Sequence, residues 1–243
     1  MDLTIDIGNN RAKCGIFNKT ELLDVLIFDE FLLQQIKSIP ERFPLISSVI
    51  VSSVVPFSLE LKEYLSQNYK LIELTERTPV PIKNLYKTPE TLGKDRLAAA
   101  VGANELYPGQ NVLAIDAGTC IKYDFVNQDN EYEGGSISPG IHMRFKALNT
   151  FTAKLPLLSP TDKMELIGKN TNESIWSGVQ NGTIAEVDGI IDEYKKKKAL
   201  LQVILTGGDL HFFDKRLKNS IFTDPFLVLK GLNVILNYNV NKL

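Results

Sequence analysis

Residues 3–8 (LTIDIG) and residues 113–118 (LAIDAG) decide the fold of this chain. The two stretches are identical at four of six positions, at an offset of 110 residues, and a second extended run follows each of them. Each copy is an apolar strand that delivers an aspartate to a glycine turn, which is typical of a hairpin. Because the offset nearly halves the chain, the repeat predicts two related lobes, residues 1–111 and residues 112–243, that face each other across a cleft.

Strands and helices alternate along the rest of the chain, which predicts an α/β architecture. Strands are expected at residues 3–7, 12–17, 49–55, 112–115, 121–126 and 201–205. Helices are expected at residues 31–39 (ended by Pro40), 58–68 (capped by Ser58), 95–105, 141–151, 172–194 and 227–239. The glycines and prolines of residues 134–140 predict a turn-rich stretch. The apolar closing helix at residues 227–239 is compatible with packing on either lobe.

The composition is that of an ordinary globular protein whose partner is a small molecule. Of 243 residues, 44% are hydrophobic and 23% are charged. Lys and Arg (27) nearly balance Asp and Glu (29), so no global field attracts nucleic acid or a membrane surface. No apolar stretch approaches the roughly 20 residues of a membrane helix, and the first residues do not resemble a signal peptide. With only two cysteines, the expected location is the cytoplasm.

The two Asp-x-Gly turns are suited to binding a polyphosphate. Consecutive backbone N–H groups of a turn can hold phosphate oxygens, and a nearby carboxylate can hold the accompanying Mg²⁺ through water. Asp6 with residues 8–10, and Asp116 with Gly118 and Thr119, would place two such turns around one ligand. The alternative for each turn is an ordinary β-turn without a ligand.

Two further segments are candidates for chemistry. Asp95 and Arg96 begin an Ala-rich helix, where the carboxylate could accept a proton from a substrate hydroxyl or only cap its own helix. Residues 206–208 (TGG) follow a late strand and offer either a flat floor for a ring such as adenine or a plain strand-to-helix turn.

Taken together, these segments resemble the type III pantothenate kinases of the acetokinase, sugar kinase and actin superfamily. The resemblance lies in residues 6–9 (DIGN) with Lys13, 51–56 (VSSVVP), 93–96 (GKDR), 116–119 (DAGT) with Asp124, 134–140, 152–156 (TAKLP), 168–171 (GKNT) with Gly178, and 206–208 (TGG). These segments follow the family's order from residue 2 to about residue 210.

The resemblance implies two duplicated ribonuclease H-like lobes, the actin-like ATPase fold, around a central nucleotide cleft. It implies ATP-dependent phosphorylation of the primary hydroxyl of pantothenate to 4'-phosphopantothenate, the first step of coenzyme A biosynthesis. It also implies Mg²⁺, a monovalent cation (K⁺ or NH₄⁺) and a homodimer. Alternatives are a kinase of another small hydroxylated metabolite, such as a sugar, or a catalytically silent nucleotide-binding regulator.

The resemblance also carries roles to individual residues. Asp95 would be the catalytic base, and pantothenate would be bound by Tyr86, Gly93, Lys94, Asp95, Arg96 and Thr171. ATP would be bound by Asp6, Ile7, Gly8, Asn9, Asn10, Arg11, Ala12, Lys13, Thr119, Gly207 and Gly208. Asp116 would hold the monovalent cation, and Asp6 would hold Mg²⁺ through water.

Two positions depart from the family pattern. Asn10 replaces a Thr or Ser, although its amide can still donate to phosphate. Lys122 stands where the family has Thr, which alters the cation or phosphate environment. Neither change removes a proposed catalytic group.

Overall fold

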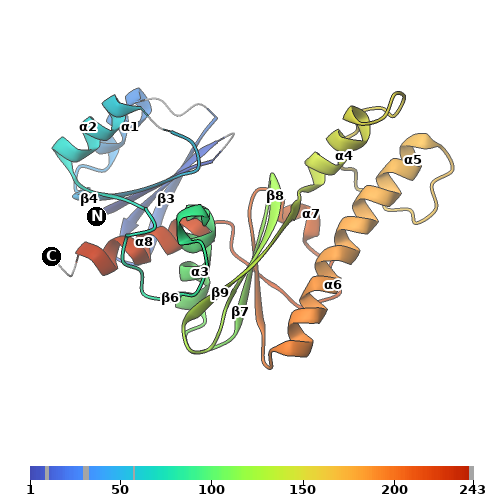
Figure 1. Ribbon diagram of the computed structural model, residues 1–243. Coiled ribbons are helices and arrows are strands. Elements are labelled where there is room, and N and C mark those ends of the chain that lie inside the picture. Colours follow the sequence, from blue (N-terminus) through green and yellow to red (C-terminus); the bar gives the residue numbers. More distant parts are fainter. Residues whose placement is uncertain (9–10, 30–32, 57, 241–243) are drawn as a thin grey trace. The chain divides into compact units, whose positions relative to one another are not determined.

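The computed structural model describes residues 1–8, 11–29, 33–56 and 58–240, and within them helices and strands alternate (Figure 1). The strands are β1 (Asp2–Ile7), β2 (Ala12–Asn18), β3 (Glu21–Phe28), β4 (Ser48–Ser53), β5 (Lys70–Glu73), β6 (Lys83–Asn84), β7 (Val112–Ala117), β8 (Cys120–Val126), β9 (Glu131–Pro139), β10 (Gln202–Thr206) and β11 (Phe222–Thr223). The helices are α1 (Leu33–Arg42), α2 (Leu59–Asn68), the 3-10 turn η1 (Pro89–Thr91), α3 (Lys94–Leu106), α4 (Ile141–Thr150), α5 (Thr171–Trp176), the π-helical turn η2 (Ser177–Asn181), α6 (Gly182–Lys197), α7 (Leu210–Phe213) and α8 (Leu227–Val240). The predicted α/β class is confirmed.

The chain forms two compact units. Unit 1 contains Met1–Gly109, Val126–Glu133 and Phe226–Leu243, and unit 2 contains Gln110–Phe125 and Gly134–Pro225. The division of the chain at residue 111 into duplicated lobes, and the cleft between those lobes, stay predictions.

The sheet of unit 1 has the strand order β3-β2-β1-β4-β5, with β1 antiparallel to β2 and parallel to β4. Because alternate side chains of a strand point to opposite faces, Leu3, Ile5 and Ile7 of β1 enter one apolar cluster. Helices α1 and α2 cover that cluster with buried isoleucines and leucines. The predicted cap at Ser58 is confirmed, since its hydroxyl accepts a hydrogen bond from Leu61 N–H at 3.2 Å.

Helix α8 packs within unit 1 against helix α3 and strands β1, β2 and β4. Two glycines allow the helices to approach closely. A Cβ on Gly231 would lie 1.8 Å from the Ala98 carbonyl oxygen, and a Cβ on Gly102 would lie 2.6 Å from the Leu227 carbonyl oxygen. These distances are far below a van der Waals contact, so the backbones of α3 and α8 touch directly.

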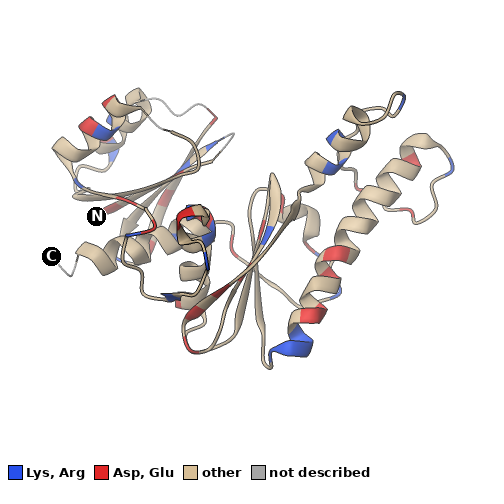
Figure 2. Ribbon diagram, in the orientation of Figure 1, with Lys and Arg blue, Asp and Glu red and all other residues tan. Residues whose placement is uncertain are grey.

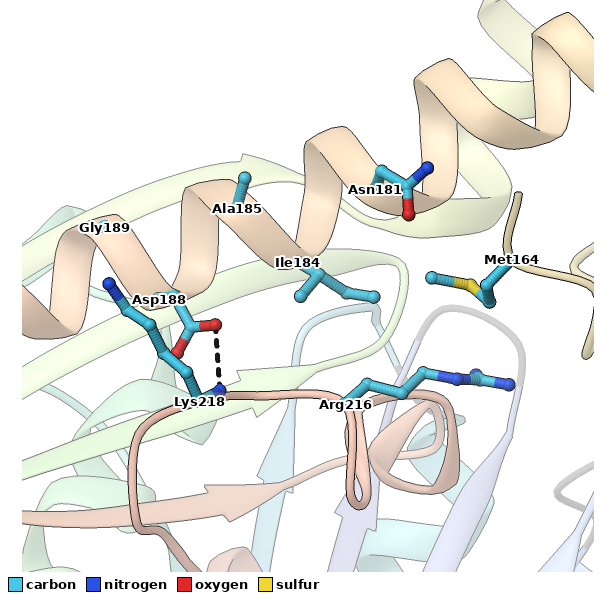
Figure 3. Close-up of a pocket in the computed structure, with 8 residues that line it drawn as sticks. All are labelled: Met164, Asn181, Ile184, Ala185, Asp188, Gly189, Arg216 and Lys218. Atoms are coloured by element: carbon cyan, nitrogen blue, oxygen red, sulfur yellow. Dashed lines mark hydrogen bonds between the residues drawn. The ribbon is translucent and has the colours of Figure 1, made fainter. Parts of the chain in front are cut away.

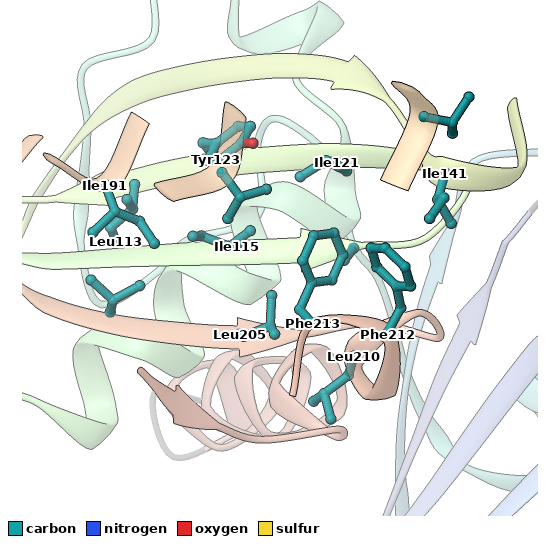
Figure 4. Packing of buried hydrophobic residues seen from close by; sticks show 14 of the residues in the cluster. Leu113, Ile115, Ile121, Tyr123, Ile141, Ile191, Leu205, Leu210, Phe212 and Phe213 are labelled. Atoms are coloured by element: carbon teal, nitrogen blue, oxygen red, sulfur yellow. The ribbon is translucent and has the colours of Figure 1, made fainter. Parts of the chain in front are cut away.

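The strands of unit 2 follow the order β11-β10-β7-β8-β9, and β7 runs parallel to β10. Figure 4 shows the apolar cluster between this sheet and its helices. Its labelled members come from β7, β8, β10, α4, α6 and α7 and are Leu113, Ile115, Ile121, Tyr123, Leu205, Ile141, Ile191, Leu210, Phe212 and Phe213. This packing fixes the carboxyl end of β7, where Asp116 lies.

The prediction that Pro40 ends the first helix is wrong. Helix α1 continues through Pro40 to Arg42, while residues 31–32 of the predicted helix lie outside the described residues. Proline removes one helical hydrogen bond, but Ile36 and Ile39 are buried in the core of unit 1. Burial of these two side chains outweighs the missing bond.

The turn-rich stretch predicted for residues 134–140 is a strand for most of its length. Strand β9 runs through Gly134 and Gly135, because pairing with neighbouring strands supplies the hydrogen bonds that local propensity does not. Strand β3, which was not predicted from the sequence, lies at the edge of its sheet and is largely half-exposed. Strand β4 ends at Ser53, two residues before its predicted end.

Charges of both signs are mixed in both units, as the balanced composition predicts (Figure 2). A run of lysines, residues 195–198, lies at the carboxyl end of α6, where positive charge complements the helix dipole. Among the described helices, none has the length and apolar character that crossing a membrane requires.

Candidate active site

The first Asp-x-Gly turn closes the β1–β2 hairpin of unit 1. Gly8 N–H donates to the Arg11 carbonyl oxygen at 2.9 Å, and Lys13 is the register partner of Asp6 across the hairpin. Asp6 and Gly8 are half-buried, whereas Arg11 is exposed and pairs with Asp29 at 2.8 Å. The predicted ATP residues Asn9 and Asn10 lie outside the described residues. The turn therefore presents a carboxylate and a lysine side by side at the end of a buried strand.

The first turn of α3 gathers the predicted substrate residues of unit 1. Gly93 precedes the helix, and Asp95 Oδ1 accepts a hydrogen bond from Arg96 N–H at 2.9 Å. The Arg96 guanidinium is buried and lies 5.5 Å from the centre of the Tyr86 ring. Tyr86 stacks in turn on Tyr132, with ring centres 6.2 Å apart.

This arrangement supports both interpretations of Asp95. Asp95 lies in the first turn of α3, where its contact with Arg96 N–H and the helix dipole both stabilise the charged carboxylate, while the N-cap residue is Gly93. Asp95 is nevertheless half-buried beside a cation and an aromatic ring, which suits a small acidic substrate with a hydroxyl group. Of the other predicted substrate residues, Lys94 is the first residue of α3, and Thr171 lies in unit 2 at the start of α5.

The second Asp-x-Gly turn joins β7 and β8 in unit 2. Gly118 N–H donates to the Cys120 carbonyl oxygen at 3.0 Å, which leaves Thr119 exposed at the tip. The Lys122 ammonium contacts Asp116 Oδ2 at 2.6 Å, and the two side chains are 18% and 17% exposed. The aspartate predicted to hold a monovalent cation is thus already paired with a cation of the chain itself.

The predicted adenine turn lies beside the same aspartate. Asp116 pairs in register with Thr206 of β10, so Gly207 follows directly. Gly207 has a φ of +100°, and a Cβ there would lie 2.2 Å from the Ala117 carbonyl oxygen and 2.5 Å from Asp116 Oδ1. Gly208 has open space around it. Unit 2 therefore brings Gly207 next to Asp116, while Thr119 lies at the tip of the turn that follows Asp116.

Gly207→Ala is expected to lower the free energy of unfolding by about 1–3 kcal/mol, because alanine would be strained at this φ and would collide with Ala117. Gly208→Ala is the matched control and should change stability by no more than about 0.5 kcal/mol. Urea denaturation of both variants measures the difference. Equal stability of the two variants would contradict the steric argument.

The sequence analysis did not select Asp209, which belongs to the same cluster in unit 2. Its Oδ1 lies 3.6 Å from His142 Nε2. Burial raises the pKa of Asp209, His142 opposes this shift and the negative charge of Asp116 adds to it. The sequence feature that could have selected Asp209 is its position directly after Gly207 and Gly208.

Asp209→Asn is expected to raise the urea midpoint at pH 7. An aspartate whose pKa is raised on folding binds its proton more tightly in the folded state, so its charged form costs stability at neutral pH. The gain should shrink as pH falls from the raised pKa of the folded state through the ordinary pKa of 3.8, because below that value both folded and unfolded wild type are protonated. Denaturation series between these pH values test this, and a gain that is constant with pH would refute it.

Unit 2 also contains a cavity of about 530 Å³ between α6 and the segment around residues 216–218 (Figure 3). Figure 3 shows Asp188 of α6 bonded to the backbone N–H of Lys218, at 3.1 Å. Asp188 also accepts from the Asn219 N–H at 3.1 Å. These bonds tie a loop to the helix, and no predicted site residue lines this cavity.

A larger cavity, of about 930 Å³, lies between α4 and α5 in the same unit. It is lined by Thr171 together with apolar side chains such as Leu148, Phe151 and Ile175. Thr171 therefore faces an apolar surface of unit 2.

The described residues contain no group of three His, Cys, Asp or Glu side chains that could hold a metal ion. Mg²⁺ does not require such a group, because one carboxylate and substrate phosphates commonly hold it. The single half-buried Asp6 fits that role. Asp116 does not fit a monovalent cation, since the Lys122 ammonium is bound to its Oδ2.

Comparison with known proteins identifies the family. A model of the type III pantothenate kinases matches residues 2–193. The chain is 50% identical over 240 residues to the type III pantothenate kinase of Phocaeicola vulgatus, covering 98% of this chain and 99% of the relative. It is 44% identical over 240 residues to that of Christiangramia forsetii, again covering 98% and 99%.

Solved structures show the same fold at lower identity. A Campylobacter jejuni protein assigned to the Baf family has a TM-score of 0.64 at 22% identity, covering 98% of this chain and 99% of that one. The activator of 2-hydroxyisocaproyl-CoA dehydratase from Clostridium difficile, with bound ADPNP, has a TM-score of 0.54 at 12% identity, covering 99% and 94%. These likenesses confirm the predicted actin-like ATPase fold. By its family match and its relatives, the chain belongs to the type III pantothenate kinases.

Proposed function

We propose that the chain uses the two candidate turns and the start of α3 to transfer phosphate from ATP to the primary hydroxyl of pantothenate. As a type III pantothenate kinase, it forms 4'-phosphopantothenate and ADP, the first step of coenzyme A biosynthesis. The observation that carries this function is the near full-length identity of 50% to a pantothenate kinase.

Asp95 is proposed as the general base. Phosphoryl transfer leaves little covalent chemistry to the protein, so positioning of the acceptor dominates. The bond to Arg96 N–H fixes the carboxylate, which accepts the hydroxyl proton as the bond to phosphorus forms. Arg96, held on Tyr86, pairs with the substrate carboxylate, and Gly93, Lys94 and Thr171 complete the proposed pantothenate site.

The two turns are proposed to bind ATP. The first turn, through Arg11, Ala12 and Lys13, and Thr119 in the second turn bind phosphate oxygens. Gly207 and Gly208 form the floor for adenine. Mg²⁺, held by Asp6 through water, would neutralise phosphate charge when bound. A monovalent cation at Asp116 is the one expected component that the residues present do not fit.

A homodimer in the cytoplasm belongs to the same proposal. The cavity that Thr171 lines is surrounded by apolar side chains such as Leu148, Ile175 and Phe151, and Phe151 is 85% exposed. Such a cluster favours coverage by a second copy of the chain. Sedimentation of the purified chain at about twice its mass of 27.2 kDa would support the dimer.

The function is tested by incubating the purified chain with ATP, Mg²⁺ and either pantothenate or a sugar, and measuring the phosphorylated product by mass spectrometry. Phosphopantothenate is expected. Phosphorylation of the sugar in place of pantothenate would favour a kinase of another metabolite. ATP binding without any product would favour a silent regulator.

A further inference from the structure

We propose that the ammonium group of Lys122 replaces the monovalent cation in this kinase, so that its activity does not depend on K⁺ or NH₄⁺. The inference rests on the proposed function. Its central observation lies entirely within unit 2, where Lys122 Nζ contacts Asp116 Oδ2 at 2.6 Å. Asp116 is the residue that, by resemblance to the type III pantothenate kinases, is expected to hold the monovalent cation.

One oxygen of Asp116 is already bound to a cation of the chain, and the other lies close to the backbone of Gly207. Oδ2 carries the Lys122 ammonium. Oδ1 lies against the backbone of Gly207, so closely that a Cβ there would be 2.5 Å away. A free cation could bind this carboxylate only by displacing Lys122 or by lying beside another positive charge, and both are unfavourable.

The burial of Lys122 distinguishes this pair from surface ion pairs. The Lys122 side chain is 18% exposed, and its strand neighbours Ile121 and Tyr123 are fully buried. In four lysine–carboxylate pairs elsewhere among the described residues, the lysine is far more exposed: Lys62 at 49%, Lys83 at 69%, Lys196 at 68% and Lys218 at 66%. Water therefore screens the Lys122–Asp116 pair less than it screens these four exposed pairs.

The ammonium group of Lys122 is chemically suited to replace a free monovalent cation. It is a compact point charge with three donors, comparable to NH₄⁺ itself. Because it is tethered to β8, it is present at every ion concentration and adds no dissociation step. The carboxylate of Asp116 is the counter-charge of the Lys122 ammonium group. A second acidic group, Asp209, interacts with Asp116 and lies next to His142.

The test compares three proteins in chloride salts of K⁺, NH₄⁺, Na⁺ and choline: wild type, Lys122→Thr and Lys218→Thr. Lys218→Thr is the matched control, because Lys218 forms an ion pair of the same 2.6 Å length, with Asp192, in the same unit. Phosphopantothenate is measured directly, since potassium-dependent coupling enzymes would report their own requirement. Binding of Mg·ADP, measured by calorimetry in each salt, is a second readout that needs no turnover.

Wild type and Lys218→Thr are expected to change less than 2-fold in kcat/KM and in ADP affinity between salts. Lys122→Thr is expected to lose at least 10-fold in choline or Na⁺ and to regain most of it in K⁺ or NH₄⁺. Stimulation of wild type by K⁺ of 10-fold or more would overturn the inference, whether or not the variant folds. It would also be overturned by a folded Lys122→Thr whose ADP affinity is at the wild-type level in choline.

The outcomes separate this inference from the proposed function. If no protein phosphorylates pantothenate in any salt, the proposed function fails. The ADP affinities of wild type and Lys122→Thr still decide whether Lys122 replaces the cation.

Discussion

Asp95→Asn is expected to lower kcat for pantothenate phosphorylation by about 10²–10⁴-fold, the contribution typical of a general base. Asparagine has nearly the same shape but cannot accept the hydroxyl proton. Its side-chain oxygen can still accept the hydrogen bond from Arg96 N–H, so the first turn of α3 should stay intact. Loss of the negative charge at the helix start should cost only about 0.3–1 kcal/mol of stability. Steady-state kinetics and urea denaturation measure the two effects separately.

The matched control is Asp129→Asn, since Asp129 is exposed in unit 1 between β8 and β9. It should leave kcat and stability close to wild type. An Asp95→Asn enzyme with unchanged kcat would remove Asp95 from the mechanism. A large loss of stability together with activity would assign it the capping role instead.

Gly231→Ala is expected to destabilise the protein by about 3 kcal/mol or more, the upper range for overpacking a core. The added methyl group would lie 1.8 Å from the Ala98 carbonyl oxygen and 2.9 Å from Gly102 N. Both contacts are with backbone atoms, so no side-chain rotation can relieve them. Helices α3 and α8 would have to separate, and α3 carries Asp95 and Arg96. Because domains are stable by only about 5–15 kcal/mol, a loss of this size is severe.

Gly189→Ala in helix α6 is the matched control for this substitution. Nothing lies within 4 Å of the position where its Cβ would be. Alanine is the better helix former, so this change should add about 0.5–1 kcal/mol. Urea unfolding midpoints of the two variants should therefore move in opposite directions. A Gly231→Ala midpoint at the wild-type value would show that α3 and α8 can separate without cost.

Local sequence features predicted the elements that depend on local chemistry. The repeated Asp-x-Gly stretches gave strands β1 and β7 and the turns that follow them, because alternation of apolar residues and a glycine turn are properties of neighbouring residues. Ser58 predicted the start of α2 for the same reason. The predictions failed at Pro40 and at Gly134-Gly135, where burial and strand pairing with distant segments overrode local preference.

The sequence by itself determined the α/β class, the family and the order of the candidate site residues along the chain. Only the tertiary structure decided what those residues touch. Lys122 appeared in the sequence as a departure from a pattern, and its bond to Asp116 depends on the packing of β7 beside β8. Gly102 and Gly231 lie in two helices far apart in the sequence, and only the fold shows that the backbones of those helices are in contact at these glycines. Propensity acts between neighbours along the chain, whereas contacts across a sheet or between helices arise only when distant segments are buried together.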